Sequence, residues 1–184
     1  MKKIIAICLC LVTFMGARAQ KTVPEIKAGT VMNASAFVQG QEFPLSLTVK
    51  SITAPVSIGW SVEGYGEGAF EMTAKSVESG TQLLAVTQPA LGITKLNDTE
   101  TFGIISNAAF KTLSATKAFT YSGVKFKLKS PETAGVKING KEVDAFHVIS
   151  EDGKQELWIL NNAAFPFIVQ SVGQATDIVI SEIK

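Results

Sequence analysis

The sequence predicts an all-β protein with one short helix, whose strands follow one another as an antiparallel meander in a curved open sheet or half-barrel. Apolar and polar residues alternate with a period of two over most of the chain, which is typical of strands with one buried face. Gly, Asn, Asp and Pro interrupt this alternation at the spacing of a meander. Counting these turn signals gives about ten strands.

The first half of the chain contains one strand with a clean alternation, Leu45–Lys50. A glycine-rich stretch, Gly64–Gly68, lies between two other strand patterns. It lacks the Lys-Thr pair and the helix of a phosphate-binding loop, so we interpret it as a hairpin tip, with Tyr65 as a candidate exposed contact residue. Further strands are expected over Val31–Val38, Ser57–Val62, Ala69–Val77 and Thr81–Thr87.

One segment has the pattern of a helix. Ser106 or Asn107 is a suitable N-cap for a short helix over Ala108–Leu113. Phe110 and Leu113 would lie on the same side of this helix, because residues three apart share a helix face. We therefore expect the helix to pack against the sheet through these two residues.

The last third of the chain carries the strongest turn signals. Asn139-Gly140 predicts a two-residue hairpin, because both residue types tolerate a positive φ, and it sets Lys137 opposite Glu142 and Val136 opposite Val143. Asp152-Gly153 predicts a second hairpin, in which a two-residue loop pairs His147 with Trp158, whereas a bulged three-residue loop shifts that register. Strands are also expected over Val124–Lys129, Phe165–Val172 and Asp177–Ile183.

The N-terminus has the three parts of a secretory signal peptide. Lys2 and Lys3 precede a mostly apolar run from Ile4 to Met15, and Ala17-Arg18-Ala19 supplies the small residues at a cleavage site. We predict residues 1–19 as the signal peptide and residues 20–184 as a single β domain, exported to the bacterial periplasm or beyond it. The apolar run is too short to span a bilayer, which takes about 20 residues, so we expect no membrane-spanning segment.

Removal of the signal peptide narrows the possible functions. Both cysteines, Cys8 and Cys10, leave with it, as do Lys2, Lys3 and Arg18, so that 14 of the 17 basic residues remain against 16 acidic ones. All 14 are lysines. Arginine is the usual residue for bidentate recognition of phosphate, so its absence and the near-neutral balance argue against a nucleic-acid partner.

The chain offers little catalytic or metal-binding chemistry, and we predict a protein that is not an enzyme and needs no cofactor. His147 is the single histidine, and with no cysteine left a zinc site would need three carboxylates, which is not the usual ligand set. Asn97–Glu100 and Glu151–Gly153 do not match the spacing of a calcium loop and are interpreted as turns. Paired-carboxylate hydrolysis is a remaining alternative, for which the available acids are Glu63, Glu67, Glu71, Asp98 and Glu100.

The number of large apolar residues in the chain suggests that it binds a ligand. Ten phenylalanines, Trp60 and Trp158 follow the signal peptide, and the apolar face of a curved sheet must be covered either by the protein itself or by a bound molecule. We take Trp60, Phe110, Trp158 and His147 as candidate ligand-lining residues. A cross-strand His147–Trp158 pair on a half-buried face is the structural alternative for the last two.

The C-terminal region resembles the closing strands of uncharacterised exported bacterial β proteins, which are similar in architecture to the lipoprotein-carrier group. The resemblance covers roughly residues 140–184 and rests on the segments Ala145–Val148, Glu156–Asn162, Phe165–Val169 and Ser181–Ile183. It implies an open, half-closed barrel that wraps a hydrophobic cavity beneath a helix. Fold does not fix function, so the function remains to be argued from the site.

Two functions are therefore expected ahead of an enzyme. The first is an exported, non-enzymatic β protein that binds a hydrophobic small molecule or lipid in a half-barrel cavity. The second is a structural or interaction domain of the cell envelope with a packed core and no ligand. An apolar cavity of several hundred cubic ångströms would favour the first, and a filled core with an exposed apolar patch would favour the second.

The signal peptide can be tested directly. Because Ala17-Arg18-Ala19 fits the cleavage pattern, the exported protein should begin at Gln20. N-terminal sequencing of protein recovered from the periplasm or the medium will measure this. An exported chain that still begins at Met1 would overturn the prediction.

Overall fold

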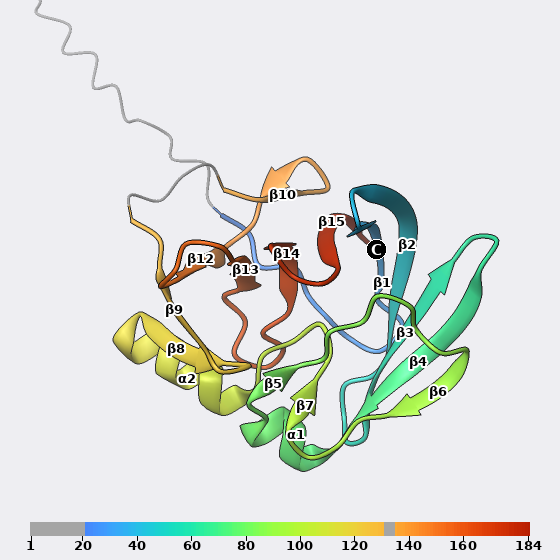
Figure 1. Cartoon of the computed structure of the whole chain (residues 1–184), viewed down its shortest axis with the longest axis horizontal. Coiled ribbons are helices and arrows are strands. Elements are labelled where there is room, and N and C mark those ends of the chain that lie inside the picture. The colour runs from blue at the N-terminus through green and yellow to red at the C-terminus, as the bar shows by residue number, and fades with distance from the viewer. Residues whose placement is uncertain (1–20, 131–134) are drawn as a thin grey trace, which may run out of the picture.

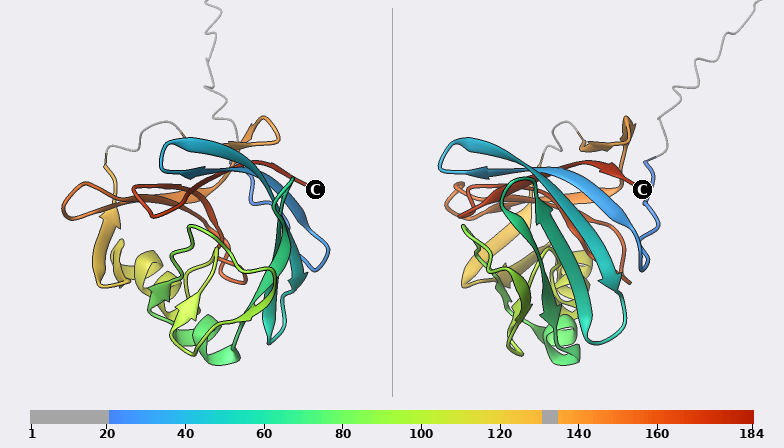
Figure 2. Two further views of the ribbon diagram at one scale, coloured as in Figure 1. Left: turned by 45° about the vertical axis from the view of Figure 1, so that its right-hand side comes forward. Right: turned by 90° about the vertical axis from the view of Figure 1, so that its right-hand side faces the viewer.

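The strands form one large open sheet. The computed structural model describes residues 21–130 and 135–184, so the predicted signal peptide lies outside the described residues. Eleven strands make up the sheet, in the order β6-β4-β3-β2-β1-β15-β14-β13-β12-β9-β8. It curves into an arch, and the connecting segments and the two helices lie along its open side (Figures 1 and 2). The predicted all-β, open, curved sheet is confirmed.

The strands of the main sheet fall into two meanders. The first comprises β1 (Val31–Val38), β2 (Gln41–Ser51), β3 (Val56–Val62) and β4 (Gly66–Met72), with β6 (Gly92–Lys95) at its edge. The second comprises β8 (Ala118–Tyr121), β9 (Val124–Leu128), β12 (Ala145–Ser150), β13 (Glu156–Leu160), β14 (Ile168–Val172) and β15 (Asp177–Ile183). Two small ribbons lie outside this sheet: β5 (Gln82–Leu83) with β7 (Glu100–Thr101), and β10 (Lys137–Ile138) with β11 (Lys141–Glu142).

The two meanders join where the first and last strands pair. Ala34 of β1 lies opposite Ile180 of β15, and Ala36 lies opposite Ile178. Alternate residues of β1 are buried, as expected for a strand with one covered face. The covered face is the concave side of the arch, and the bounds of β1 and β15 match the prediction.

One departure from the predicted meander is a second helix. Ala69–Val77 was expected to be a single strand, but β4 ends at Met72 and α1 (Ala74–Ser79) follows. Thr73 caps this helix, since its Oγ1 accepts a hydrogen bond from the Ser76 amide at 3.0 Å. The expected strand over Thr81–Thr87 was also wrong beyond Leu83, because residues 84–91 form neither helix nor strand.

Another departure is that the sheet is mixed. β6 pairs with β4 in a parallel direction, with Gly68 opposite Gly92 and Glu71 opposite Lys95. A parallel neighbour needs a long crossover, and residues 73–91, which include α1, supply it. The remaining neighbours in the main sheet are antiparallel.

The helix predicted from the sequence is present as α2 (Asn107–Thr116). Ser106 is its N-cap and accepts a hydrogen bond from the Ala109 amide. Phe110 and Leu113 are buried in a core cluster between α2 and strands β8, β9, β12 and β13. The ring of Phe110 meets that of Phe146 edge-on, with centroids 5.9 Å apart. A second, larger core cluster joins residues of the first meander to residues of β13, β14, β15 and β10.

Asn139-Gly140 forms the predicted tight hairpin, between β10 and β11. Lys137 pairs with Glu142, and both turn residues have positive φ angles, 53° and 73°. Asn139 also fastens the turn to the chain end, because its Nδ2 donates to the Ile183 carbonyl at 2.7 Å. The hairpin therefore clamps the last strand from outside the main sheet.

We expect Gly140→Val to lower the free energy of unfolding by about 1–2 kcal/mol, because a β-branched residue is strained at a positive φ. A Cβ at this position would meet no neighbouring atom, so the cost is conformational rather than steric. Gly140→Asn, a residue that tolerates this φ, is the matched control and should cost less. Chemical denaturation of the three proteins measures the difference, and equal stability of Gly140→Val and the wild type would contradict this turn geometry.

Candidate functional site

An apolar cavity of about 350 Å³ lies on the concave face of the first meander. Its floor consists of buried side chains from the sheet and its neighbours, among them Leu47, Trp60 and Phe167. Phe70 and Phe102 stand beside each other in the wall, with ring centroids 4.2 Å apart. The cavity is within the usual size range of small-molecule sites, roughly 300–1,000 Å³.

Small residues on the sheet help to leave this space. Ala36 of β1 lines the cavity opposite Phe43 of β2 and Ile178 of β15, so a short side chain lies between two long ones. Gly103 lines it beside Phe167, and a Cβ on Gly103 would come within 2.9 Å of that ring. The cavity therefore results partly from small residues placed next to large ones.

Trp60 lies across the neighbouring strand instead of rising into the space. Gly68, its cross-strand partner on β4, allows this, because a Cβ there would be 2.8 Å from the indole Nε1. The same Cβ would come within 2.5 Å of the Gly92 carbonyl oxygen, so Gly68 also permits the close approach of β6. The buried Nε1 has no hydrogen-bond partner within the described part of the chain.

Residues 84–91, hereafter the cover segment, run along the open side of the arch (Figure 2). Residues 84–89 of this segment line the cavity. Hydrogen bonds fasten the segment at three points. The Leu84 amide donates to the Thr101 carbonyl at 2.8 Å, and the Thr176 hydroxyl donates to the Val86 carbonyl. The Tyr65 hydroxyl donates to the Pro89 carbonyl at 2.8 Å.

Of the four sequence-predicted lining residues, the structure places one at the cavity. Trp60 is part of its wall, whereas Phe110 packs beneath α2, and His147 and Trp158 are not among the lining residues. His147 and Trp158 do lie together: they are cross-strand partners, and their rings stack with centroids 3.9 Å apart. The predicted register of this hairpin is confirmed, although its loop closes through a Ser150–Gln155 hydrogen bond and is longer than two residues.

The His147–Trp158 stack belongs to an ionic cluster on the face of β12 and β13 that is turned away from α2. His147 Nε2 lies 2.5 Å from the Glu156 carboxylate, which also accepts two hydrogen bonds from Lys129 Nζ, at 2.7 and 2.8 Å. The Lys129 ammonium group, and to a lesser extent His147, hold the pKa of Glu156 below its ordinary value. Glu156 and Lys129 are paired, and His147 is paired through Nε2, whereas its buried Nδ1 has no hydrogen-bond partner among the described residues. The cluster joins β12 and β13 to the residue that follows β9.

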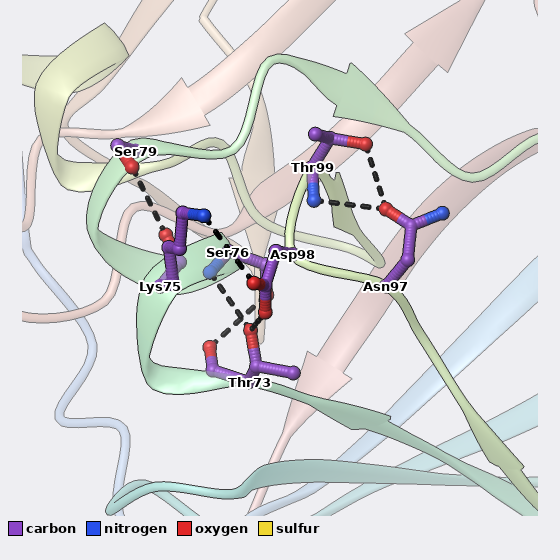
Figure 3. A network of polar contacts seen from close by, with 7 residues as sticks. All are labelled: Thr73, Lys75, Ser76, Ser79, Asn97, Asp98 and Thr99. Atoms are coloured by element: carbon purple, nitrogen blue, oxygen red, sulfur yellow. Dashed lines mark hydrogen bonds and ion pairs between the residues drawn. The ribbon is translucent and has the colours of Figure 1, made fainter.

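The acids considered for hydrolysis are distributed over several elements. Glu63 follows β3 at the hairpin tip, Glu67 and Glu71 both lie on β4, and Glu100 lies on β7. Asp98 is engaged at the start of α1: it accepts a hydrogen bond from Thr73 Oγ1 at 2.9 Å and pairs with Lys75 at 3.4 Å (Figure 3). Within residues 21–130 and 135–184, no three His, Cys, Asp or Glu side chains are grouped to hold a metal ion.

Comparison with known proteins finds no relative of this chain. No protein-family model matches the chain, and no curated protein or solved structure is significantly similar to it. No helix in the described part of the chain is both long and apolar enough to cross a membrane. The function must therefore be inferred from the cavity itself.

Sequence reasoning missed most of the cavity wall. The cover segment was taken for part of a strand, although Pro89 and the absence of strict alternation from Leu83 to Val86 were signals against it. The hairpin tip was correctly located: Gly64 and Gly66 have positive φ angles, and Tyr65 between them is 41% exposed. That Tyr65 fastens the cover segment depends on a contact between residues 24 positions apart.

We expect Tyr65→Phe to loosen the cover segment, because it removes one of the three hydrogen bonds that fasten it. A hydrogen bond contributes about 1 kcal/mol net, so amide hydrogen exchange in peptides covering residues 84–91 should rise about fivefold. Thr87→Val is the matched control, because it removes a hydroxyl of the same segment that makes no hydrogen bond within the described residues. Identical exchange in Tyr65→Phe and the wild type would show that this contact does not hold the cover.

Proposed function

We propose that this chain is an exported, non-enzymatic protein that binds a hydrophobic or amphipathic ligand between the concave face of the sheet and the cover segment. The observation that carries the proposal is the apolar cavity of about 350 Å³. The cavity opens to solvent, and its volume lies within the range of small-molecule sites, roughly 300–1,000 Å³.

The side chains of the cavity wall favour binding of an apolar ligand group over water. Leu47, Trp60, Phe70 and Phe167 are all at least 97% buried, yet each contributes to the cavity surface. A bound apolar group would gain contacts with these side chains and release water from its own surface, at roughly 25 cal/mol per Å² buried. The site therefore supplies binding energy without specific polar contacts at its floor.

The rim offers a route for an apolar ligand. Phe43 and Tyr65 line the cavity while 39% and 41% of their surfaces face solvent. Leu91, at the end of the cover segment, is 64% exposed. These side chains form an apolar approach from the outside to the cavity, which a packed structural domain would not need.

A second candidate function is that of an interaction domain. It is favoured by the edge strand β6, where Ile93 is 65% exposed next to Leu91 and β4 is the single sheet neighbour among the described strands. Exposed apolar side chains on an unpaired edge are typical of a surface that pairs with another chain. Ligand binding is the test that separates the two functions.

We expect the protein to bind N-phenyl-1-naphthylamine, an uncharged fluorescent probe, saturably and with unit stoichiometry. Linear alcohols should displace the probe, and each added methylene that enters the cavity should tighten binding about fourfold until the space is filled. Fluorescence titration below the critical micelle concentration measures both effects. Absence of saturable binding would favour the interaction domain and contradict the ligand-binding function.

Filling the cavity should abolish this binding. Val38 lines the cavity, whereas Val172 at the end of β14 is 44% exposed and is not among the lining residues. We therefore expect Val38→Phe to weaken probe binding at least tenfold and the matched variant Val172→Phe to leave it unchanged. Circular dichroism of both variants controls for the fold, and equal binding by the two folded variants would place the probe elsewhere.

A further inference from the structure

The cavity wall carries no charged side chain. None of the residues that line it is Asp, Glu, Lys, Arg or His. Its polar members are Tyr65, Thr87, Gln88, Ser171, Gln174 and Thr176, together with the indole nitrogen of Trp60. A ligand that carried a net charge into this space would lose hydration without gaining an ion-pair partner, which is strongly unfavourable.

Three of the polar lining residues are already occupied by the protein. The Ser171 hydroxyl donates to Asp177 at 3.3 Å, and the Gln174 amide side chain donates to Gln155 at 3.2 Å. The Thr176 hydroxyl is committed to Val86 of the cover segment. These hydrogen bonds hold the wall and the cover segment in place, so the three donor groups are not free to bind a ligand.

Apart from the buried indole N–H of Trp60, which has no partner among the described residues, the polar side chains that remain available lie on the cover segment. Thr87 and Gln88 are both exposed, and their side chains make no hydrogen bond within the described residues. A hydroxyl and a carboxamide can each donate and accept, so they suit a headgroup such as an alcohol, ester or amide. The hydroxyl of Tyr65 can also accept there while it donates to Pro89.

The formal charges that directly adjoin the wall in sequence are all negative. Glu42, Glu63, Glu71 and Asp177 each neighbour a lining residue, and no lysine does. The Asp177 carboxylate is one hydrogen bond behind the wall, through Ser171, and is satisfied by the backbone amides of Gly173 and Gln174 at 3.0 and 2.9 Å. Because it already accepts these three hydrogen bonds, this carboxylate is engaged by the protein and supplies no cation-binding group at the wall.

We propose that the cavity selects an uncharged amphiphile, with an apolar chain over the floor and a hydroxyl, ester or amide headgroup at Thr87 and Gln88. This rests on the proposed ligand-binding function and adds the class of ligand. Free fatty acids should bind more weakly at neutral pH, because their ionised carboxylate finds no cation among the lining residues. Alkylammonium amphiphiles are excluded because no carboxylate lines the wall.

The test compares three probes of equal chain length: decan-1-ol, decanoate and decyltrimethylammonium, each competing against N-phenyl-1-naphthylamine at pH 8. Decan-1-ol should bind at least about tenfold more tightly than either ion, which corresponds to 1.4 kcal/mol. Equal or tighter binding of decanoate or of decyltrimethylammonium would overturn the selection for neutral ligands while leaving the ligand-binding function intact. Failure of all three, together with the fluorescent probe, would overturn the function itself.

A substitution on the cover segment makes the test independent of the alcohol's solubility. Thr87→Lys supplies the missing cation at the proposed headgroup position, whereas Thr87→Gln changes size without adding charge. Decanoate should bind about tenfold more tightly to Thr87→Lys than to Thr87→Gln, and decan-1-ol should show no such gain. An equal gain for both ligands, or none for decanoate, would show that the headgroup does not lie at Thr87.

Discussion

The pairing of β1 with β15 is the contact on which the rest of the structure depends. Each meander alone is a set of local hairpins with one apolar face, and such a face is stable only when it is covered. Joining the first strand to the last merges both faces into one concave surface. The β10–β11 hairpin reinforces this joint, because Asn139 makes two hydrogen bonds to Ile183 at the end of β15.

The concave surface is covered unevenly, and that is why a cavity forms at one end. Over the second meander, α2 inserts Phe110 and Leu113 and completes a packed cluster. Over the first meander, the cover is a segment without regular structure, which lines the cavity together with the small residues Ala36 and Gly103. Helix α2 packs its side chains into the space between itself and the sheet. The cover segment is fastened at a few points and leaves part of the space below it unfilled.

The sequence predicted the elements better than the site, for a physical reason. Period-two alternation located β1 and β15, and Asn139-Gly140 gave the hairpin, because these signals are local. Helix α1 was missed because the alternation of β4 runs directly into it, and the Thr73–Ser76 cap was the signal that marked the change. Alternation separates the two faces of a strand but does not say which face is concave. Trp60 and Trp158 were therefore both predicted to line the cavity, and only Trp60 does.

The same alternation explains how a chain with many charged residues keeps its cavity neutral. On β13, Leu157 and Ile159 face the α2 core cluster, while Glu156 and Trp158 lie on the opposite face with His147. The Lys129–Glu156–His147 cluster therefore ties β12 and β13 to the residue that follows β9, on the face turned away from α2. On β2 and β4, the charged residues Glu42, Glu67 and Glu71 alternate with the residues that line the cavity, so the neutrality of the cavity follows from the periodicity of these strands. The cover segment on the open side of the arch is not a strand, so its side chains do not alternate between two faces. Its exposed residues Thr87 and Gln88 are therefore the polar groups that a ligand in the cavity would meet.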